Sequence, residues 1–283
     1  MAVIINGKEV AKKTLEILKT KVQNLSDKPK LAVILANDNP SSKIYVNSKE
    51  KQALNLGFKS EVFRFDESVK METITNLIQK LNKDKETNGI LVQLPLFSHL
   101  DEQKILELIE PIKDVDGFHP INVGRLNCGL EPFAKPCTPK GIIKLLNFYN
   151  IDPKGKLALV IGRSNIVGKP IATLLSNLDA TVILAHSKTQ NLKELSKQAD
   201  IIVSATGQAG LIKEDMVKKG AIVLDVGITK KEDGKLSGDV DFENVSKIAS
   251  YITPVPGGIG PMTIASLMEN TFELYLKQKE QEG

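Results

Sequence analysis

Six short runs of apolar, mostly β-branched residues are separated by longer amphipathic segments, and this alternation constrains the fold more than any other feature of the sequence. The runs are residues 31–36 (LAVILA), 90–94 (ILVQL), 157–161 (LALVI), 181–185 (TVILA), 201–205 (IIVSA) and 221–226 (AIVLDV). A strand that is apolar along its whole length is buried on both faces, as strands of parallel sheets are. The segments between the runs have helical spacing, for example 71–81, 103–109 and 140–149. The sequence therefore predicts an α/β fold with βαβ units and a doubly wound parallel sheet.

The length of 283 residues is that of one large or two ordinary domains. Residues 136–139 (PCTP) interrupt regular structure and mark a predicted boundary between an N-terminal and a C-terminal half. Residues 262–279 form a predicted helix, and periodicity does not show which half this helix packs against. The apolar positions of this helix are Ile264, Leu267, Met268, Phe272 and Leu276.

Composition and charge exclude several classes of function. The net charge is +4, from 38 basic and 34 acidic side chains, and the lysines are dispersed, which argues against binding to nucleic acid. No apolar run reaches the length of a membrane span, and the N-terminus lacks the apolar core of a secretory signal. The two cysteines, Cys128 and Cys137, indicate a reducing compartment and hence a cytoplasmic protein, although they could still pair. No Cys/His set has metal-ligand spacing, so no metal is predicted.

A glycine turn follows the run at 157–161. It reads Gly162-Arg-Ser-Asn-Ile-Val-Gly168-Lys-Pro170 and leads into the helical segment IATLLSNL. A strand, a glycine turn and a helix form the first unit of a dinucleotide-binding fold, in which the N–H groups of the helix N-terminus bind the pyrophosphate. The spacing is not GxGxxG, so by itself the turn is equally compatible with a purely structural connection.

The end of the next predicted strand bears on the choice of cofactor. An NAD site usually has Asp or Glu there to bind the ribose 2′-hydroxyl. Here the strand ends in Ala185-His-Ser187-Lys188-Thr, with Arg163 nearby in the glycine turn, and this set favours a 2′-phosphate. The alternative is an ordinary solvated loop. A later strand ends at Thr206, where small residues would let a cofactor lie close to the backbone.

The N-terminal half contains the residues suited to proton chemistry. Tyr45 and Lys49 lie four residues apart in a predicted helix and therefore share one face. Gln93 interrupts an otherwise apolar, central strand, and an amide there needs hydrogen-bond partners. Asp116 lies in a turn where its carboxylate could bind adjacent N–H donors of a heterocycle, whereas His119 in the same turn is expected to be structural. Taken singly, Tyr45 and Lys49 are better explained as a half-buried tyrosine and a surface lysine, and only the other residues of this half favour a catalytic role.

These segments together resemble the methylenetetrahydrofolate dehydrogenase/methenyltetrahydrofolate cyclohydrolase family over essentially the whole chain. Several long motifs in the same order are far more specific than one glycine turn. The motifs are YVNSKEK (45–51), GILVQLPL (89–96), KDVDGFHPINVGRL (113–126), PCTPKGI (136–142), GRSNIVGKP (162–170) and PGGIGPMT (256–263).

The resemblance implies two α/β domains flanking a cleft, the C-terminal one with a Rossmann-like doubly wound parallel sheet. A folate-binding, catalytic domain would comprise residues 1–138 plus 263–283, and an NADP-binding domain residues 139–262. The enzyme would oxidise 5,10-methylenetetrahydrofolate with NADP and hydrolyse the methenyl product to 10-formyltetrahydrofolate, in one-carbon metabolism that serves purine biosynthesis. Family members are commonly homodimers that associate through the cofactor domain.

The resemblance also implies roles for individual residues. Lys49 would handle protons with Gln93 as its hydrogen-bond partner, Asp116 would bind the pterin, and Tyr45 would stack on its ring system. Further predicted positions fall into two groups, defined by the ligand that they contact. Pro254 and Gly257 would line the substrate, and NADP would contact Gly162, Arg163, Ser164, Ile166, Ser187, Thr206 and Ile228.

Two other hypotheses are compatible with a Rossmann unit. One is a dehydrogenase for an unrelated small acid, but such an enzyme would need a catalytic His and a substrate-binding Arg in place of the set Tyr45, Lys49, Gln93 and Asp116. The other is a non-catalytic nucleotide sensor, which the presence of Lys49 argues against.

Overall fold

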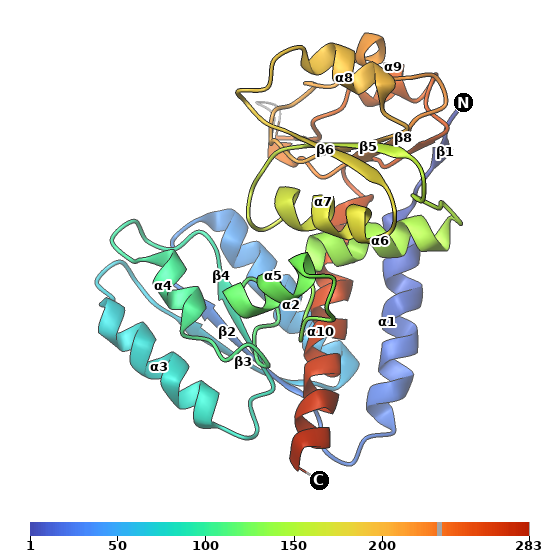
Figure 1. Ribbon diagram of the computed structural model, residues 1–283. Coiled ribbons are helices and arrows are strands. Elements are labelled where there is room, and N and C mark those ends of the chain that lie inside the picture. Colours follow the sequence, from blue (N-terminus) through green and yellow to red (C-terminus); the bar gives the residue numbers. More distant parts are fainter. Residues whose placement is uncertain (231–233, 283) are drawn as a thin grey trace. The chain divides into compact units, whose positions relative to one another are not determined.

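The computed structural model describes residues 1–230 and 234–282, and the chain forms two compact units (Figure 1). Unit 1 comprises residues 1–12 and 138–263, and unit 2 comprises residues 13–137 and 264–283. The two long helices α1 (Gly7–Gln23) and α10 (Ile259–Glu282) begin in unit 1 and continue into unit 2. No helix among the described residues is both long and apolar enough to cross a membrane.

Unit 1 contains a six-stranded parallel sheet with the order β1-β11-β8-β7-β5-β6. Its strands are β1 (Val3–Ile4), β5 (Leu157–Ile161), β6 (Thr181–Ala185), β7 (Ile201–Ser204), β8 (Ile222–Asp225) and β11 (Tyr251–Ile252). Helices α6 and α7 lie on one face and α8 and α9 on the other, which makes the sheet doubly wound as predicted (Figure 1). The remaining elements are α6 (Cys137–Phe148), α7 (Gly168–Asn177), α8 (Leu192–Gln198), η1 (Glu214–Met216), α9 (Phe242–Val245) and the hairpin of β9 (Thr229–Lys230) and β10 (Leu236–Ser237).

The strand order of unit 1 reverses beside β5. From β5 the chain moves to β6 on one side and then to β7 and β8 on the other. Two neighbouring connections that leave a sheet in opposite directions open a crevice at the carboxyl ends of the strands, where ligands of α/β proteins bind. The ends of β5 and β7 are therefore the expected position of a cofactor.

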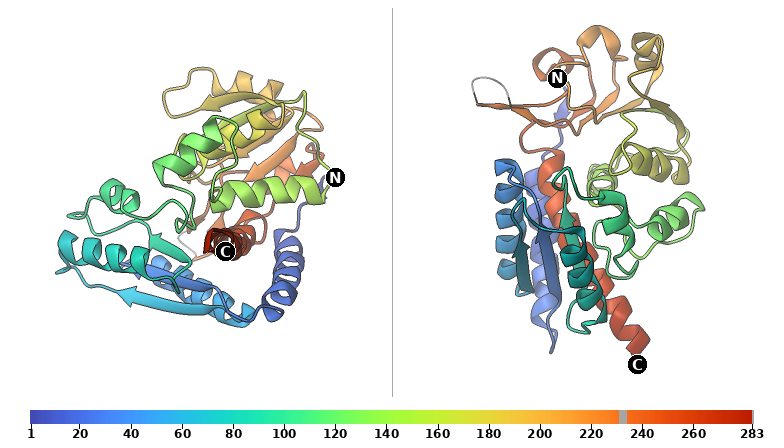
Figure 2. Two further views of the ribbon diagram at one scale, coloured as in Figure 1. Left: turned by 60° about the horizontal axis from the view of Figure 1, so that its bottom comes forward. Right: turned by 90° about the vertical axis from the view of Figure 1, so that its left-hand side faces the viewer.

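Unit 2 contains a three-stranded parallel sheet with the order β3-β2-β4. Residues of β2 alternate between two cores: Leu31, Val33 and Leu35 pack with α1, α2 and α10, whereas Ala32 and Ile34 pack with α3 and α4 (Figure 2). This period of two is the geometry of a strand buried on both faces. The elements are β2 (Lys30–Leu35), β3 (Lys59–Arg64), β4 (Gly89–Gln93), α2 (Pro40–Leu56), α3 (Met71–Lys83), α4 (Glu102–Glu107) and α5 (Pro120–Asn127).

Several details differ from the sequence analysis. Residues 1–12 group with unit 1, whereas the expected division placed them with the N-terminal domain, because β1 pairs with β11. The PCTP segment does not interrupt regular structure throughout, since α6 begins at Cys137 and Pro139 lies in its first turn. In α10, Leu276 is 38% exposed, while Leu267, Met268 and Phe272 are buried in unit 2. Strand β4, which carries Gln93, is at the end of the strand order and is not central.

Candidate active site

Helix α2 carries Tyr45 and Lys49 on one face. The helix begins after Asn39, whose side chain accepts a hydrogen bond from Ser41 N (2.9 Å), with Pro40 in the first helical position. It ends at Gly57, which has the left-handed conformation (φ 84°). Lys49 is partly buried, and Tyr45, one turn earlier, is 41% exposed, so its ring is accessible to a ligand.

Gln93, the last residue of β4, joins this helix through a side-chain contact. Lys49 Nζ donates a hydrogen bond to Gln93 Oε1 (2.9 Å). Gln93 Nε2 donates to the backbone oxygen of Leu94 (2.8 Å), so the oxygen of the amide is the atom that faces the lysine. A nearby buried amide, Asn37, donates to Pro95 O (2.6 Å) and so connects the end of β2 to the segment after Gln93. The position of Lys49 Nζ is therefore defined by its own helix and by the end of β4.

Asp116 lies in a turn whose shape depends on its neighbour Asp114. The Asp114 carboxylate is buried and accepts hydrogen bonds from Gly117 N (3.0 Å), His119 N (2.8 Å) and Asn122 Nδ2 (3.0 Å). These bonds close the turn around Asp116. His119 Nδ1 accepts from Ile121 N (3.1 Å) and caps α5, which is the structural role expected for it.

The surroundings of Asp116 disfavour its ionised form, without preventing ionisation at neutral pH. Burial raises the pKa of Asp116 to about 6, while the positive charge of Lys49 opposes the rise and the negative charge of Asp114 adds to it. The Sγ atom of Cys137 is 3.6 Å from Asp116 Oδ1. Burial also raises the pKa of Asp114, and the hydrogen bonds that Asp114 accepts oppose this rise. At neutral pH the carboxylate of Asp116 is mostly ionised and can accept hydrogen bonds from a ligand.

In unit 1, the glycine turn connects β5 to α7. Gly162 has φ 115°, and a Cβ at this position would collide with the backbone oxygen of Ala205, so the turn requires glycine. Ser164 Oγ accepts from Val167 N (3.2 Å) and Gly168 N (3.3 Å) at the start of α7. The turn therefore holds the chain close to the end of β7 and presents a helix N-terminus, which suits a pyrophosphate.

A pocket of about 370 Å³ opens at the carboxyl ends of β5, β6 and β7. Its lining includes four of the predicted cofactor residues: Gly162, Arg163, Ser187 and Thr206. Arg163 and Ser187 are exposed, and the described residues that line the pocket include no carboxylate. A site with a basic side chain and hydroxyl groups in place of an acid fits a cofactor with a 2′-phosphate.

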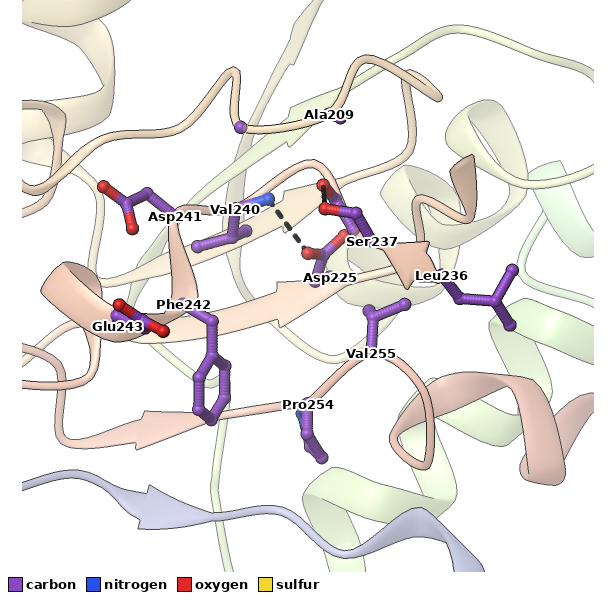
Figure 3. Close-up of a pocket in the computed structure, with 12 residues that line it drawn as sticks. Ala209, Asp225, Leu236, Ser237, Val240, Asp241, Phe242, Glu243, Pro254 and Val255 are labelled. Atoms are coloured by element: carbon purple, nitrogen blue, oxygen red, sulfur yellow. Dashed lines mark hydrogen bonds between the residues drawn. The ribbon is translucent and has the colours of Figure 1, made fainter. Parts of the chain in front are cut away.

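The other predicted cofactor residues lie close by in the chain but outside this lining. Ser164 and Ile166 are exposed residues of the glycine turn, and Ile228, which is 45% exposed, follows β8. The two predicted substrate residues, Pro254 and Gly257, lie in the loop of unit 1 between β11 and α10. Pro254 lines a second cavity of about 610 Å³, together with Asp225, Val255 and residues 236–238 and 240–243 (Figure 3).

The structure thus brings Lys49, Gln93 and Asp116 together in unit 2 and gathers four cofactor residues around one pocket in unit 1. Asn37 and Asn122, which hold the end of β2 and the Asp116 turn, were not predicted. Asn37 donates to Pro95, 58 residues away, and Asn122 donates to Asp114 across a turn whose shape the sequence does not show. Cys128 is exposed and Cys137 is buried, and the two do not form the disulfide that the sequence left open.

In comparison with known proteins, both units of the chain match the same family. Residues 5–116 match the catalytic domain, and residues 136–279 the NAD(P)-binding domain, of tetrahydrofolate dehydrogenase/cyclohydrolase. A bifunctional FolD protein of Campylobacter hominis is 54% identical over 273 residues, covering 95% of this chain and 96% of that protein. The crystal structure of the bifunctional FolD methylenetetrahydrofolate dehydrogenase/cyclohydrolase from Campylobacter jejuni has a TM-score of 0.96 at 52% identity, covering 98% and 99% of the two chains. The Trypanosoma brucei dehydrogenase-cyclohydrolase, complexed with NADP and an inhibitor, has a TM-score of 0.93 at 38% identity, covering 98% of each chain.

Proposed function

The chain belongs to the tetrahydrofolate dehydrogenase/cyclohydrolase family, and we propose that Lys49 is the proton-handling residue of its reactions. The protein is an NADP-dependent enzyme with two activities. It oxidises 5,10-methylenetetrahydrofolate to 5,10-methenyltetrahydrofolate and hydrolyses this product to 10-formyltetrahydrofolate. The family membership rules out both an unrelated hydroxy-acid dehydrogenase and a non-catalytic nucleotide sensor.

The hydrogen bond between Lys49 Nζ and Gln93 Oε1 is the observation that carries the proposed role of Lys49. The methenyl product is a cation, and its hydrolysis requires a water molecule to lose a proton as it attacks the one-carbon unit. A neutral lysine amine can accept that proton. Because the Gln93 amide donates to Leu94 O, its oxygen accepts one N–H of Lys49, and we propose that the rest of the amine contacts the substrate.

Asp116 is proposed to bind the pterin of the substrate. A pterin presents neighbouring N–H donors, and a carboxylate can accept two hydrogen bonds from them in parallel. Asp114 and Asn122 keep the turn in place, so the carboxylate of Asp116 is already positioned before the ligand binds. Tyr45, one turn before Lys49, is proposed to stack on the ring system of the folate. In unit 1, Pro254 and Gly257 are proposed to contribute further substrate contacts.

NADP, when bound, accepts the hydride that the methylene carbon gives up. We propose that seven residues of unit 1 hold it. Arg163 and Ser187 are proposed to bind the 2′-phosphate, because both are exposed at the pocket and no carboxylate among the described residues of its lining would repel that group. Gly162, Ser164 and Ile166 form the turn that would bind the pyrophosphate, and Thr206 and Ile228 are proposed to lie beside the nicotinamide.

We further propose a cytoplasmic homodimer that associates through unit 1 and supplies one-carbon units for purine biosynthesis. Strand β6 is at one end of the six-stranded order, and Leu184 on it is 37% exposed. An exposed strand edge can pair with the same strand of a second copy about a two-fold axis. Light scattering should give the mass of a dimer for the wild-type protein and a smaller mass for Leu184→Glu.

One assay tests both the reactions and the order in which they occur. The purified protein is mixed with 5,10-methylenetetrahydrofolate and NADP, and absorbance is followed at one wavelength for the reduced cofactor and at another for the methenyl intermediate. The expected result is a steady rise of reduced cofactor with only a small, transient pool of intermediate. Absence of cofactor reduction would contradict the first activity. A methenyl pool that decays no faster than in buffer alone would contradict the second activity.

A further inference from the structure

Unit 1 buries two aspartates to which the roles proposed above assign no function. Asp225 ends β8 and is 3% exposed, and Asp239 lies between β10 and α9 and is completely buried. Asp225 lines the second cavity, whereas Asp239 is not among the residues that line it (Figure 3). A buried carboxylate is costly unless hydrogen bonds compensate for the lost water, so the partners of these two groups show what they hold in place.

Asp239 binds the end of β7. Its Oδ2 atom accepts hydrogen bonds from Ser204 Oγ (2.9 Å), Thr206 N (2.7 Å) and Thr206 Oγ1 (2.9 Å). The same Thr206 hydroxyl accepts a hydrogen bond from Gln208 N (3.2 Å). Both the backbone and the hydroxyl of Thr206 are therefore held in one orientation by a single carboxylate oxygen.

Asp225 joins this contact to the end of β8. Its Oδ1 atom accepts from Gly227 N (3.0 Å) and from Asp239 N (2.9 Å), and its Oδ2 atom accepts from Val240 N (2.9 Å; Figure 3). A Cβ at Gly227 would collide with Asp239 Oδ1, so the turn after β8 packs directly on the second carboxylate. The two aspartates thus connect the end of β7, the end of β8 and residues 238–240.

Two buried negative charges close together destabilise the fold unless other interactions compensate for them. The pKa of Asp225 is raised to about 6, chiefly by burial and also by the nearby charge of Asp239, although three backbone N–H groups favour the ionised form. Perturbed carboxylates that persist in a folded protein cluster at functional sites. The two chain segments that they fix, 204–208 and 225–228, include Thr206 and Ile228, the two residues proposed to lie beside the nicotinamide.

We propose that Asp225 and Asp239 are positioning residues for the nicotinamide half of NADP, acting through Thr206 and the turn that precedes Ile228. The proposal rests on the cofactor site proposed above. Neither carboxylate is a catalytic residue, because both act through backbone and hydroxyl groups. Hydride transfer depends steeply on the placement of the nicotinamide, whereas binding of the adenosine 2′-phosphate half depends on Arg163 and Ser187.

The test compares Asp239→Asn with wild type in three measurements. These are the dehydrogenase kcat, the cyclohydrolase rate on methenyltetrahydrofolate without NADP, and the affinity for 2′-phospho-ADP-ribose, which lacks the nicotinamide. We expect the dehydrogenase kcat to fall by about 10- to 100-fold, the scale for a displaced reacting group. The cyclohydrolase rate and the affinity for the fragment should stay at wild-type values. Ser204→Ala, which removes one of the three bonds to Asp239, should show the same pattern with a smaller loss.

A matched control is Asp241→Asn, the same substitution two residues further along. Asp241 accepts a hydrogen bond from Asn244 Nδ2 (2.8 Å) and should tolerate the change with all three measurements unaltered. Equal losses of both activities in Asp239→Asn would show a general structural role and overturn the proposal, as would an unchanged dehydrogenase kcat. If Asp239→Asn does not fold, Ser204→Ala decides by the same criteria. If the wild-type protein itself reduces no NADP, the proposed function is wrong. The ratio of NADP affinity to fragment affinity in Asp239→Asn and Ser204→Ala then still decides whether Asp225 and Asp239 position the nicotinamide.

Discussion

Replacing Asp116 by asparagine should make the folded protein more stable at neutral pH while it removes folate binding. The ionised carboxylate is held in a partly buried turn, beside the charge of Asp114, where its pKa is raised to about 6. A raised pKa means that the folded protein disfavours the ionised carboxylate. The charge that binds the ligand therefore lowers the stability of the fold. An amide of the same shape removes the charge, but it presents a donor to the N–H donors of the pterin.

The size of the gain follows from the pKa. The value of about 6 lies roughly 2 units above the ordinary value of 3.8, and each unit corresponds to about 1.4 kcal/mol. Because the folded state binds the proton more tightly than the unfolded state, stability falls as pH rises between about 4 and 6, and the loss is complete above that range. Asp116→Asn should therefore gain up to about 3 kcal/mol in the free energy of unfolding at pH 8, and about half of that at pH 5.

Urea unfolding of the wild-type protein and of Asp116→Asn at pH 5 and pH 8 measures this difference, and titration with folate measures binding. Asp66→Asn is a control of opposite sign, since hydrogen bonds from Ser68 lower the pKa of Asp66, so that its charged form stabilises the fold above that pKa. A gain for Asp116→Asn that does not change with pH, or a loss of stability at pH 8, would refute the raised pKa. Unchanged folate affinity would remove Asp116 from the substrate site.

Three further predictions concern the cofactor, the lysine partner and the core. Arg163→Ala should weaken NADP binding by about 1.5–3 kcal/mol and NAD binding far less, because only NADP has the 2′-phosphate; equal losses in fluorescence titrations would contradict the assignment. Gln93→Leu removes the acceptor of Lys49 Nζ, and the cyclohydrolase rate should fall by about 10-fold or more, which a direct assay of methenyltetrahydrofolate hydrolysis checks. Ile34→Ala, at a fully buried position of β2, should cost about 2–5 kcal/mol in urea unfolding, and a loss below about 1 kcal/mol would contradict its place in the core.

The sequence predicts best those elements whose pattern is local. Residues 157–161 and 181–185 are continuous apolar runs, and they form β5 and β6 with the predicted bounds. Strand β3, by contrast, was missed: its sequence KSEVFR alternates with polar residues because the strand is at the edge of its sheet. The pairing of β1 with β11 was also missed, since the partners are about 250 residues apart and two-residue strands have no periodicity.

In the candidate site, too, the sequence predicts the features that are local and misses contacts that depend on the fold. A spacing of four residues placed Tyr45 and Lys49 on one helix face, and the absence of an acid after β6 indicated NADP. The contact between Lys49 and Gln93 joins residues 44 positions apart, and the two atoms of that bond are known only once β4 is placed against α2. The hydrogen bonds of Asp239 with Ser204 and Thr206 have no sequence signal, because an aspartate after a turn is ordinary in any loop.

The most direct test of the proposed mechanism is the rate at which Lys49→Met hydrolyses methenyltetrahydrofolate. Methionine keeps much of the apolar stem of lysine and removes the amine, so packing in α2 should change little, which circular dichroism and thermal melting can establish first. We expect a cyclohydrolase rate lower by at least about 100-fold, with partial dehydrogenase activity and accumulation of the methenyl intermediate. A folded Lys49→Met protein that hydrolyses methenyltetrahydrofolate at the wild-type rate would contradict the role of Lys49.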